Sequence, residues 1–287
     1  MRPIRFALAA TLAAALAACA GGMMNGGALS SRQITQVVAA PDRSDADRSN
    51  DLRRKPELLL GFLGLQGGMQ VLDVSTGGGY TTELLARAVG PGGKVYAQAR
   101  PPVAEAPRPA APEGGAGVPA ELRSASAAAP PPAPRRTAAD AIAERVRHLQ
   151  EAHVAAAPIV FVSRPFDDPA PPELAGTLDL VTLMFNYHDC GWMGVDRAAM
   201  NRAIFKALRP GGVFVVADHA GRPGTGITES GTLHRVEESL VRSEIEAAGF
   251  RLAAEGDFLR NPADPRDRNT PSPPQPKDEF VLKFVKP

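Results

Sequence analysis

The sequence predicts an α/β protein in which helices cover both faces of a largely parallel sheet. From Met69 onward, short apolar runs typical of strands alternate with amphipathic runs typical of helices. Such alternation produces crossover units and a parallel sheet. A second observation is size, because 287 residues with 44% hydrophobic content can bury one sizeable core.

The elements follow from the same patterns. Val236, Leu240, Val241 and Ile245 mark one apolar side of a helix, and Gly249 follows as its terminator. We expect further helices at residues 32–40, 50–65, 81–89, 137–152 and 198–208, besides the one at 236–248. The expected strands are 70–75, 94–98, 158–163, 178–185, 212–218, 250–255 and 279–285.

The first nineteen residues have the layout of an export signal. Arg2 and Arg5 precede an apolar stretch that is short for a membrane span. Residues 16–19, Leu-Ala-Ala-Cys, resemble the lipobox of bacterial lipoproteins, in which the signal is cut before a cysteine that carries lipid. The alternative is an ordinary signal with a chance cysteine. We expect export to the periplasmic side of a bacterial membrane and a lipid anchor at Cys19, with a tether over 20–31 and the domain over 32–287.

Two segments of unusual composition interrupt the domain. Residues 100–136 are dominated by alanine and proline, so we expect a disordered surface insertion after the second strand. The composition of residues 261–278 predicts a flexible loop.

The charge of the chain argues against a nucleic-acid partner. The net charge is +1, and no run of Lys or Arg forms the basic stripe that binding to nucleic acid requires. Once Cys19 is lipidated, Cys190 is the remaining thiol, so an intrachain disulfide is excluded.

The main clue to function is the segment VLDVSTGGG, residues 71–79. An apolar strand ends near Asp73, turns on glycines and leads into a helix, so a ligand can approach bare backbone there. A phosphate-binding P-loop would need Lys and Ser or Thr after the last glycine, where Tyr80 and Thr81 stand. A dinucleotide fingerprint would place a pyrophosphate beside Asp73, and that carboxylate repels an anion. A cationic amino-acid ligand such as S-adenosylmethionine suits the charge better.

The segment resembles the first motif of the class I S-adenosylmethionine-dependent methyltransferases, VLDxGxGxG, with Ser75 in place of the first glycine. LDLVTLMFNYHD and LRPGGVFVVADH resemble the fourth and fifth strands of that family, and further segments resemble an exported branch of predicted methyltransferases. The resemblance implies a doubly wound seven-stranded sheet, Rossmann-like, with the last strand antiparallel. It also implies S-adenosylmethionine as cofactor, across the carboxyl ends of the first strands.

The resemblance assigns cofactor roles to residues of the first three strands. The second strand should end in an acid that binds the ribose hydroxyls, but Gln98 and Ala99 stand there, so Gln98 becomes the candidate. Asp167 or Asp168 occupies the place that often contacts adenine, unless both belong to a solvated turn. The methionine moiety would be held by Asp73, Ser75, Thr76, Gly77, Gly78 and Gly79.

Candidates for the acceptor side lie at the exit of the fourth strand, where Asn186, Tyr187, His188 and Asp189 follow one another. Methyl transfer is a direct displacement, so positioning matters most and a base only when the acceptor arrives protonated. His188 is the leading candidate for that base. The alternative is a structural histidine that only forms hydrogen bonds with the loop backbone. Tyr187 forms either an aromatic wall or packing.

His219, His234 and Arg235 are candidate substrate residues above the sheet. Arg235 either binds an acidic substrate or pairs with Glu237 or Glu238. A metal site is an alternative, since the three histidines could converge with Asp189 and Asp218, but no H-x-x-x-H spacing fixes two ligands, so we assign no metal ligand.

We therefore expect methyl transfer to a small-molecule acceptor. The competing function is a non-catalytic, lipid-anchored binding protein that keeps the fold, because fold alone does not decide between them. A metal-assisted hydrolase comes third.

Overall fold

A seven-stranded sheet forms the centre of the molecule, with strand order β3-β2-β1-β4-β5-β7-β6. The computed structural model describes residues 27–102, 136–269 and 275–287. Neighbouring strands are parallel except where β7 lies antiparallel to both β5 and β6. The strands are β1 (Gln70–Val74), β2 (Lys94–Ala99), β3 (Ile159–Ser163), β4 (Leu178–Met184), β5 (Leu208–His219), β6 (Arg251–Gly256) and β7 (Glu279–Val285). The order reverses between β1 and β4, which creates the crevice where open α/β sheets bind ligands.

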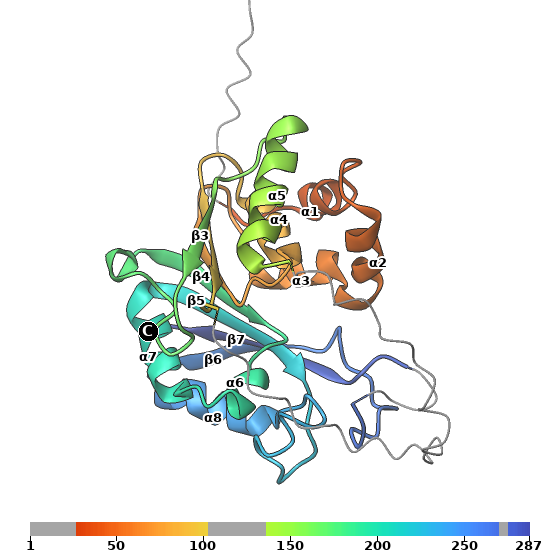
Figure 1. Ribbon diagram of the computed structural model, residues 1–287, viewed down its shortest axis with the longest axis vertical. Coiled ribbons are helices and arrows are strands. Elements are labelled where there is room, and N and C mark those ends of the chain that lie inside the picture. Colours follow the sequence, from red (N-terminus) through yellow and green to blue (C-terminus); the bar gives the residue numbers. More distant parts are fainter. Residues whose placement is uncertain (1–26, 103–135, 270–274) are drawn as a thin grey trace, which may run out of the picture.

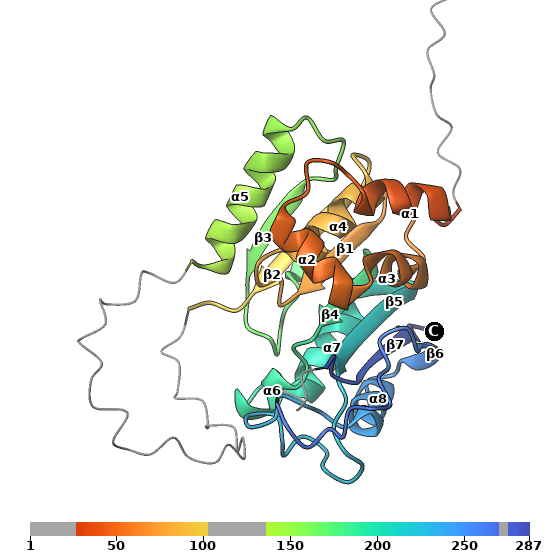
Figure 2. The ribbon, with the colours of Figure 1, turned by 90° about the vertical axis from the view of Figure 1, so that its right-hand side faces the viewer.

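Helices cover both faces of the sheet (Figures 1 and 2). The N-terminal helices, α4 and α5 lie on one side, and α7 and α8 lie on the other. The helices are α1 (Ser31–Val38), α2 (Asp45–Arg54), α3 (Pro56–Leu63), α4 (Tyr80–Val89), α5 (Ala138–Glu151), α6 (Asp189–Trp192), α7 (Arg197–Ala207) and α8 (Glu238–Ala247), with a 3-10 turn at Pro172–Leu174. In the described residues, no helix has both the length and the apolar character needed to cross a membrane.

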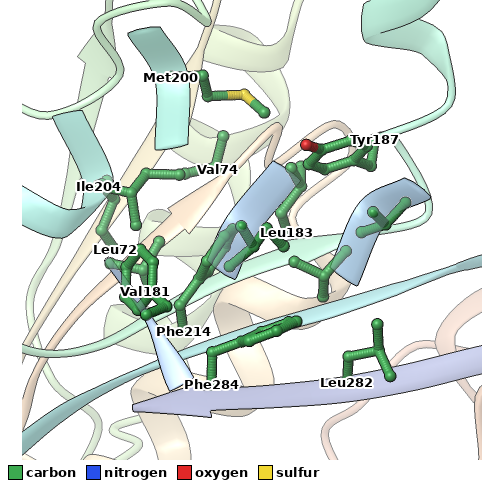
Figure 3. Close-up of a cluster of buried hydrophobic side chains, with 14 of the residues drawn as sticks. Leu72, Val74, Val181, Leu183, Tyr187, Met200, Ile204, Phe214, Leu282 and Phe284 are labelled. Carbon is green, nitrogen blue, oxygen red and sulfur yellow. The ribbon is translucent and has the colours of Figure 1, made fainter. Parts of the chain in front are cut away.

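Alternation of side chains along the strands divides the core into two layers. Leu72 and Val74 point toward α7 and α8, and Figure 3 shows them beside Met200, Ile204 and Phe214. The intervening Val71 packs with the side chains of α1, α3 and α4 on the opposite face. Asp73 points to the same face as Val71 but lies near the carboxyl end of β1. The alternation along the strand therefore places its carboxylate at the edge of the sheet.

Several helix starts are encoded locally. Ser30 and Gln33 form a capping box at α1, and Thr137 and Asp140 form another at α5. Ser44 caps α2 by accepting a hydrogen bond from the amide of Asp47. The polar segment 45–49 is therefore helical, although the sequence predicted helix only from residue 50.

The structure corrects other boundaries as well. The single helix predicted over 50–65 is two helices, because Lys55 has a φ of 44° and Pro56 begins the second. Residue 236 is not helical: Val236 forms an isolated bridge with Ala220, and α8 begins at Glu238. The short helix α6 was not predicted. The predicted signal, lipid attachment site and tether up to residue 26 lie outside the described residues, as do 103–135 of the predicted insertion and 270–274 of the predicted loop.

Candidate functional site

The glycine turn at the end of β1 is built for close approach to its backbone. Gly77 and Gly79 have positive φ angles of 52° and 78°, which glycine adopts without steric cost. A Cβ atom at Gly79 would lie 2.7 Å from Cδ of Arg145, whereas one at Gly78 would meet nothing within 4 Å. Both the positive φ and the close approach of Arg145 favour glycine at Gly79, while Gly78 leaves open space beside the chain. Ser75, which replaces the expected glycine, has a φ of 61° and is held in the left-handed region.

Asp73 is a buried carboxylate at the rim of this turn. Its side chain accepts hydrogen bonds from Oγ1 of Thr82 at 2.6 Å and Oγ1 of Thr182 at 2.8 Å. Burial raises the pKa of Asp73 to about 6, although the two threonines and Arg54 act in the opposite direction. The residue is 2% exposed, so its negative charge at neutral pH is poorly solvated and favours a cationic ligand.

Two cavities of about 270 Å³ each flank the turn. Ser75 and Gly77 line both, so the turn separates them. The Asp73 cavity is lined on its other sides by Asn50, Arg54, Asp73, Thr81 and Met184. The Phe166 cavity is lined on its other sides by Ala99, Phe166, Asn186, Asp189 and Trp192. A larger cavity of about 440 Å³ lies beside the turn between α2 and α5 and meets it only at Gly78.

Arg54 brings a positive charge into the Asp73 cavity. Its guanidinium carbon lies 3.8 Å from the centre of the Phe185 ring, a cation–π distance. Burial and the neighbouring Arg53 lower the pKa of Arg54 to about 10, so the side chain stays charged at neutral pH. The cavity therefore presents a carboxylate from β1 and a guanidinium from α2.

Arg145 of α5 connects the glycine turn to helix α2. Its Nε donates to the carbonyl of Gly78 at 2.6 Å, and its Nη1 donates to Asp47 of α2 at 2.8 Å. The same Nη1 lies 2.6 Å from Oε2 of Glu83 in α4. Asp47 and Glu83 are both buried, and burial makes such charge-assisted bonds costly to break. One side chain thereby holds α2 over the Asp73 cavity.

Gln98 stands behind the turn instead of facing a ligand. It is fully buried, its Oε1 accepts from the amide of Ser75 at 2.9 Å, and its Nε2 donates to the carbonyl of Arg164 at 2.6 Å. Ala99 lines the Phe166 cavity in its place. The role that the structure gives Gln98 is to hold the strained Ser75, and it offers no contact to the expected ribose hydroxyls.

The predicted adenine-contacting acids also lie away from the turn. Asp168 is paired with Arg164 on the surface, and Asp167 is exposed; neither lines the two cavities beside the turn. The neighbouring Phe166, which is 6% exposed, forms the cavity wall. An apolar ring, which the sequence analysis passed over, is therefore the feature that this loop presents to a ligand.

His188 is held between two carboxylates. Its Nδ1 lies 2.6 Å from Oδ1 of Asp218, its amide donates to Oδ2 of Asp218 at 2.8 Å, and its Nε2 lies 3.3 Å from Oδ1 of Asp189. Burial alone would lower the pKa of His188, but Asp218 and Asp189 raise it to about 9. Both ring nitrogens of His188 therefore face carboxylates, and the raised pKa favours the protonated imidazole, which counts against the predicted role of His188 as a base.

Asn186 and Tyr187 follow the same strand but have different surroundings. Nδ2 of Asn186 donates to Asp189 at 2.9 Å, while its buried Oδ1 has no hydrogen-bond partner among the described residues. Tyr187 is fully buried, and its hydroxyl donates to Glu244 at 2.7 Å and accepts from Asn201 at 3.0 Å. Figure 3 shows its ring among core side chains, so Tyr187 is packing and not a wall of either flanking cavity.

The remaining histidines converge as the sequence suggested. The ring centre of His188 lies 5.5 Å from those of both His219 and His234. Burial lowers the pKa of His219 well below its usual value. His234 has a φ of 52°, and its Nδ1 lies 3.5 Å from Oδ1 of Asp189.

Arg235 has neither of its predicted roles. It is fully buried, and its Nη2 lies 2.9 Å from Oδ2 of Asp264, which belongs to the predicted flexible loop. Its Nη1 donates to the carbonyl of Ala220 at 3.0 Å. Arg235 therefore ties the start of that loop to the end of β5, and it is unavailable to an acidic substrate.

Comparisons with known proteins agree with this architecture. The family model of protein-L-isoaspartate(D-aspartate) O-methyltransferase matches residues 56–102, which include α3, β1, the glycine turn, α4 and β2. No curated protein sequence matches the chain. The family match therefore covers the strand and turn that the sequence singled out, and about a sixth of the chain.

Solved structures extend the likeness to the whole fold. A SAM-dependent methyltransferase from Aquifex aeolicus is 16% identical, covers 90% of this chain and 98% of its own, and has a TM-score of 0.50. A candidate sarcosine dimethylglycine methyltransferase from Galdieria sulphuraria is 14% identical, covers 89% and 97%, and also has a TM-score of 0.50. The predicted fold class is confirmed: the chain has the Rossmann-like fold of these methyltransferases, with β7 antiparallel. The cofactor named for the Aquifex protein is the one that the sequence predicts here.

Proposed function

We propose that this protein is a class I S-adenosylmethionine-dependent methyltransferase acting on a small molecule. The observation that carries the proposal is the Asp73 cavity, in which a buried carboxylate stands beside open glycine backbone. A phosphate ligand would be repelled by that carboxylate, whereas a sulfonium or ammonium group would be attracted.

The two charges of the cavity suit the amino-acid end of the cofactor. That end is a zwitterion, with an ammonium group for Asp73 and a carboxylate for Arg54. Thr82 and Thr182 orient the Asp73 carboxylate by donating to it. The residues present therefore fit both charged groups of the ligand.

The adenosine end fits the Phe166 cavity on the other side of the turn. The Phe166 ring supplies an apolar face for the base. The unpartnered Oδ1 of Asn186 can accept a hydrogen bond from the ligand. Ala99 contributes no hydrogen bond to the ribose, so we expect weaker binding than a carboxylate at that position would give.

When bound, the cofactor supplies a methyl group on a positively charged sulfur. The protein's contribution is mainly orientation, because a direct displacement needs the acceptor in line with the bond that breaks. The ring nitrogens of His188 near the exit of β4 both face carboxylates, with Nδ1 2.6 Å from Asp218 and Nε2 3.3 Å from Asp189, so His188 is not free to take up the acceptor's proton. The acceptor must therefore present an unprotonated nucleophile or lose its proton to another group.

Gly78 offers a sharp test, since it lines the Asp73 cavity and a side chain there would enter open space beside the turn. We expect calorimetric titration of the full chain with S-adenosylmethionine to show binding that Gly78→Val abolishes. The fold should tolerate this change, because a Cβ at Gly78 meets nothing within 4 Å. Gly27→Val is the matched control, since Gly27 has equally open surroundings and lines neither cavity.

Two outcomes separate the candidate functions. Equal binding by Gly78→Val and the wild type, or none by the wild type, would contradict the cofactor assignment. Tight binding without methyl transfer to any member of a panel of thiols, amines, phenols and carboxylic acids would favour the binding-protein alternative.

Location is a separate part of the proposal. We propose that the chain is exported and anchored by lipid at Cys19, on the support of the two N-terminal arginines, the short apolar stretch and the Leu-Ala-Ala-Cys segment. Mass spectrometry of the mature N-terminus tests this, since a diacylglyceryl-modified Cys19 is the expected product and an unprocessed Met1 would contradict it.

A further inference from the structure

Three side chains from two distant segments form a cluster with the ligand types of a transition-metal site. His188 and Asp189 lie at the exit of β4, and His234 lies in the loop before α8. One ligand atom from each falls within 4.8 Å of the others. The donors are two imidazole nitrogens and a carboxylate oxygen, a set that first-row transition metals accept.

The separations match ligands arranged around a common ion. Nε2 of His188 lies 3.3 Å from Oδ1 of Asp189, and Nδ1 of His234 lies 3.5 Å from the same oxygen. Ligands bound tetrahedrally at zinc distances stand about 3.3 Å from each other. The distances fit ligands around a shared ion as well as direct pairing of the three groups.

Outer contacts hold two of the ligands in place. Asp218 is fully buried and forms hydrogen bonds with both Nδ1 and the main-chain amide of His188. Nε2 of His188 therefore faces Asp189. Nε1 of Trp192 donates to Oδ1 of Asp189 at 3.0 Å, and Nδ2 of Asn186 donates to Oδ2. A carboxylate behind a ligating histidine and hydrogen bonds to a ligating carboxylate are the usual surroundings of protein metal sites.

We propose that His188, Asp189 and His234 bind a first-row transition-metal dication of the Zn²⁺ type, which replaces the proton on Nε2 of His188 and releases it to solvent, with Asp218 orienting His188. In the described part of the chain the cluster supplies three ligands, and a tetrahedral ion has one further coordination position, as in catalytic zinc sites. Asp189 also lines the Phe166 cavity, so the ion lies at its edge. The open position suits a ligand with an anionic oxygen or a thiolate. The site does not depend on the proposed methyl transfer, because metal binding is measured without the cofactor.

The test is metal content of the full chain after chelator treatment, addition of Zn²⁺ and removal of excess ion. We expect one Zn²⁺ per chain by inductively coupled plasma mass spectrometry, and visible absorption of a tetrahedral site when Co²⁺ is substituted. His234→Ala should lose at least 100-fold in affinity and the Co²⁺ spectrum. Asp218→Asn should weaken binding by about 10- to 100-fold, as outer partners do.

His148→Ala is the matched control, because His148 lies in α5 outside the cluster and should leave the stoichiometry unchanged. Circular dichroism of each variant shows whether it is folded. If Asp218→Asn is not folded, His234→Ala alone decides whether the cluster binds the metal. Absence of bound Zn²⁺ in the wild type, or equal retention by His234→Ala, would overturn the proposal.

Discussion

Asp73→Asn should make the protein more stable at pH 8 while removing its affinity for S-adenosylmethionine. Burial raises the pKa of the native carboxyl to about 6, against its usual value of 3.8. A carboxyl whose pKa is raised by folding contributes stability when protonated; that contribution is complete below about pH 4 and is lost as the pH rises through 6. At pH 8 the ionised carboxylate therefore weakens the native state, and the neutral amide does not.

The magnitude follows from the same shift. Two pKa units correspond to about 3 kcal/mol. An amide keeps one acceptor oxygen, so the hydrogen bond from Thr182 or that from Thr82 is lost, at a cost of about 1 kcal/mol. The expected gain in unfolding free energy is about 2 kcal/mol at pH 8, and it should vanish near pH 4.

Urea unfolding of both proteins between pH 4 and 8 measures this difference, with calorimetric titration of S-adenosylmethionine at pH 8 beside it. Asp168→Asn, an exposed loop carboxylate, is the control and should change stability by less than about 0.5 kcal/mol. Loss of stability by Asp73→Asn at pH 8, or wild-type affinity for the cofactor, would refute the reasoning.

Three further changes test other parts of the account. Arg54→Met should weaken S-adenosylmethionine binding by about 10- to 100-fold in calorimetry, since a charge-assisted hydrogen bond is lost. The melting temperature should stay nearly unchanged, and an affinity equal to that of the wild type would exclude Arg54 from the site. Arg235→Met should lower the unfolding free energy by about 3–5 kcal/mol in urea, because Asp264 loses its buried partner, and a change below 1 kcal/mol would count against that role. Cys19→Ser should move the chain from the membrane to the soluble fraction upon cell fractionation, and continued membrane association would argue against lipidation.

The strand, turn and helix around Asp73 were predictable because their signals are local. The apolar run, the carboxylate and Gly77–Gly79 stand within ten residues, and periodicity alone places them at the end of a buried strand. The two-layer core follows similarly from alternation along the strands. Local signals also explain an error, since the apolar pattern over 50–65 concealed the break that Lys55 and Pro56 impose.

Contacts between distant segments carried no such signal. Arg145 meets Asp47 across 98 residues, and nothing near either residue in the sequence indicates the partner. Gln98 was expected to face the ligand because its position matched a family pattern, but side-chain direction in a strand reverses at each residue and placed Ala99 there instead. The cluster of His188, Asp189 and His234 depends on a loop whose course the sequence does not specify.

The central claim is that the two cavities beside the glycine turn hold S-adenosylmethionine, and a crystal structure of the complex tests it most directly. We predict the amino-acid end between Asp73 and Arg54 and the adenine against Phe166, with Gly78 backbone alongside. Ligand density in the 440 Å³ cavity between α2 and α5, or vacant flanking cavities at saturating cofactor, would contradict the claim.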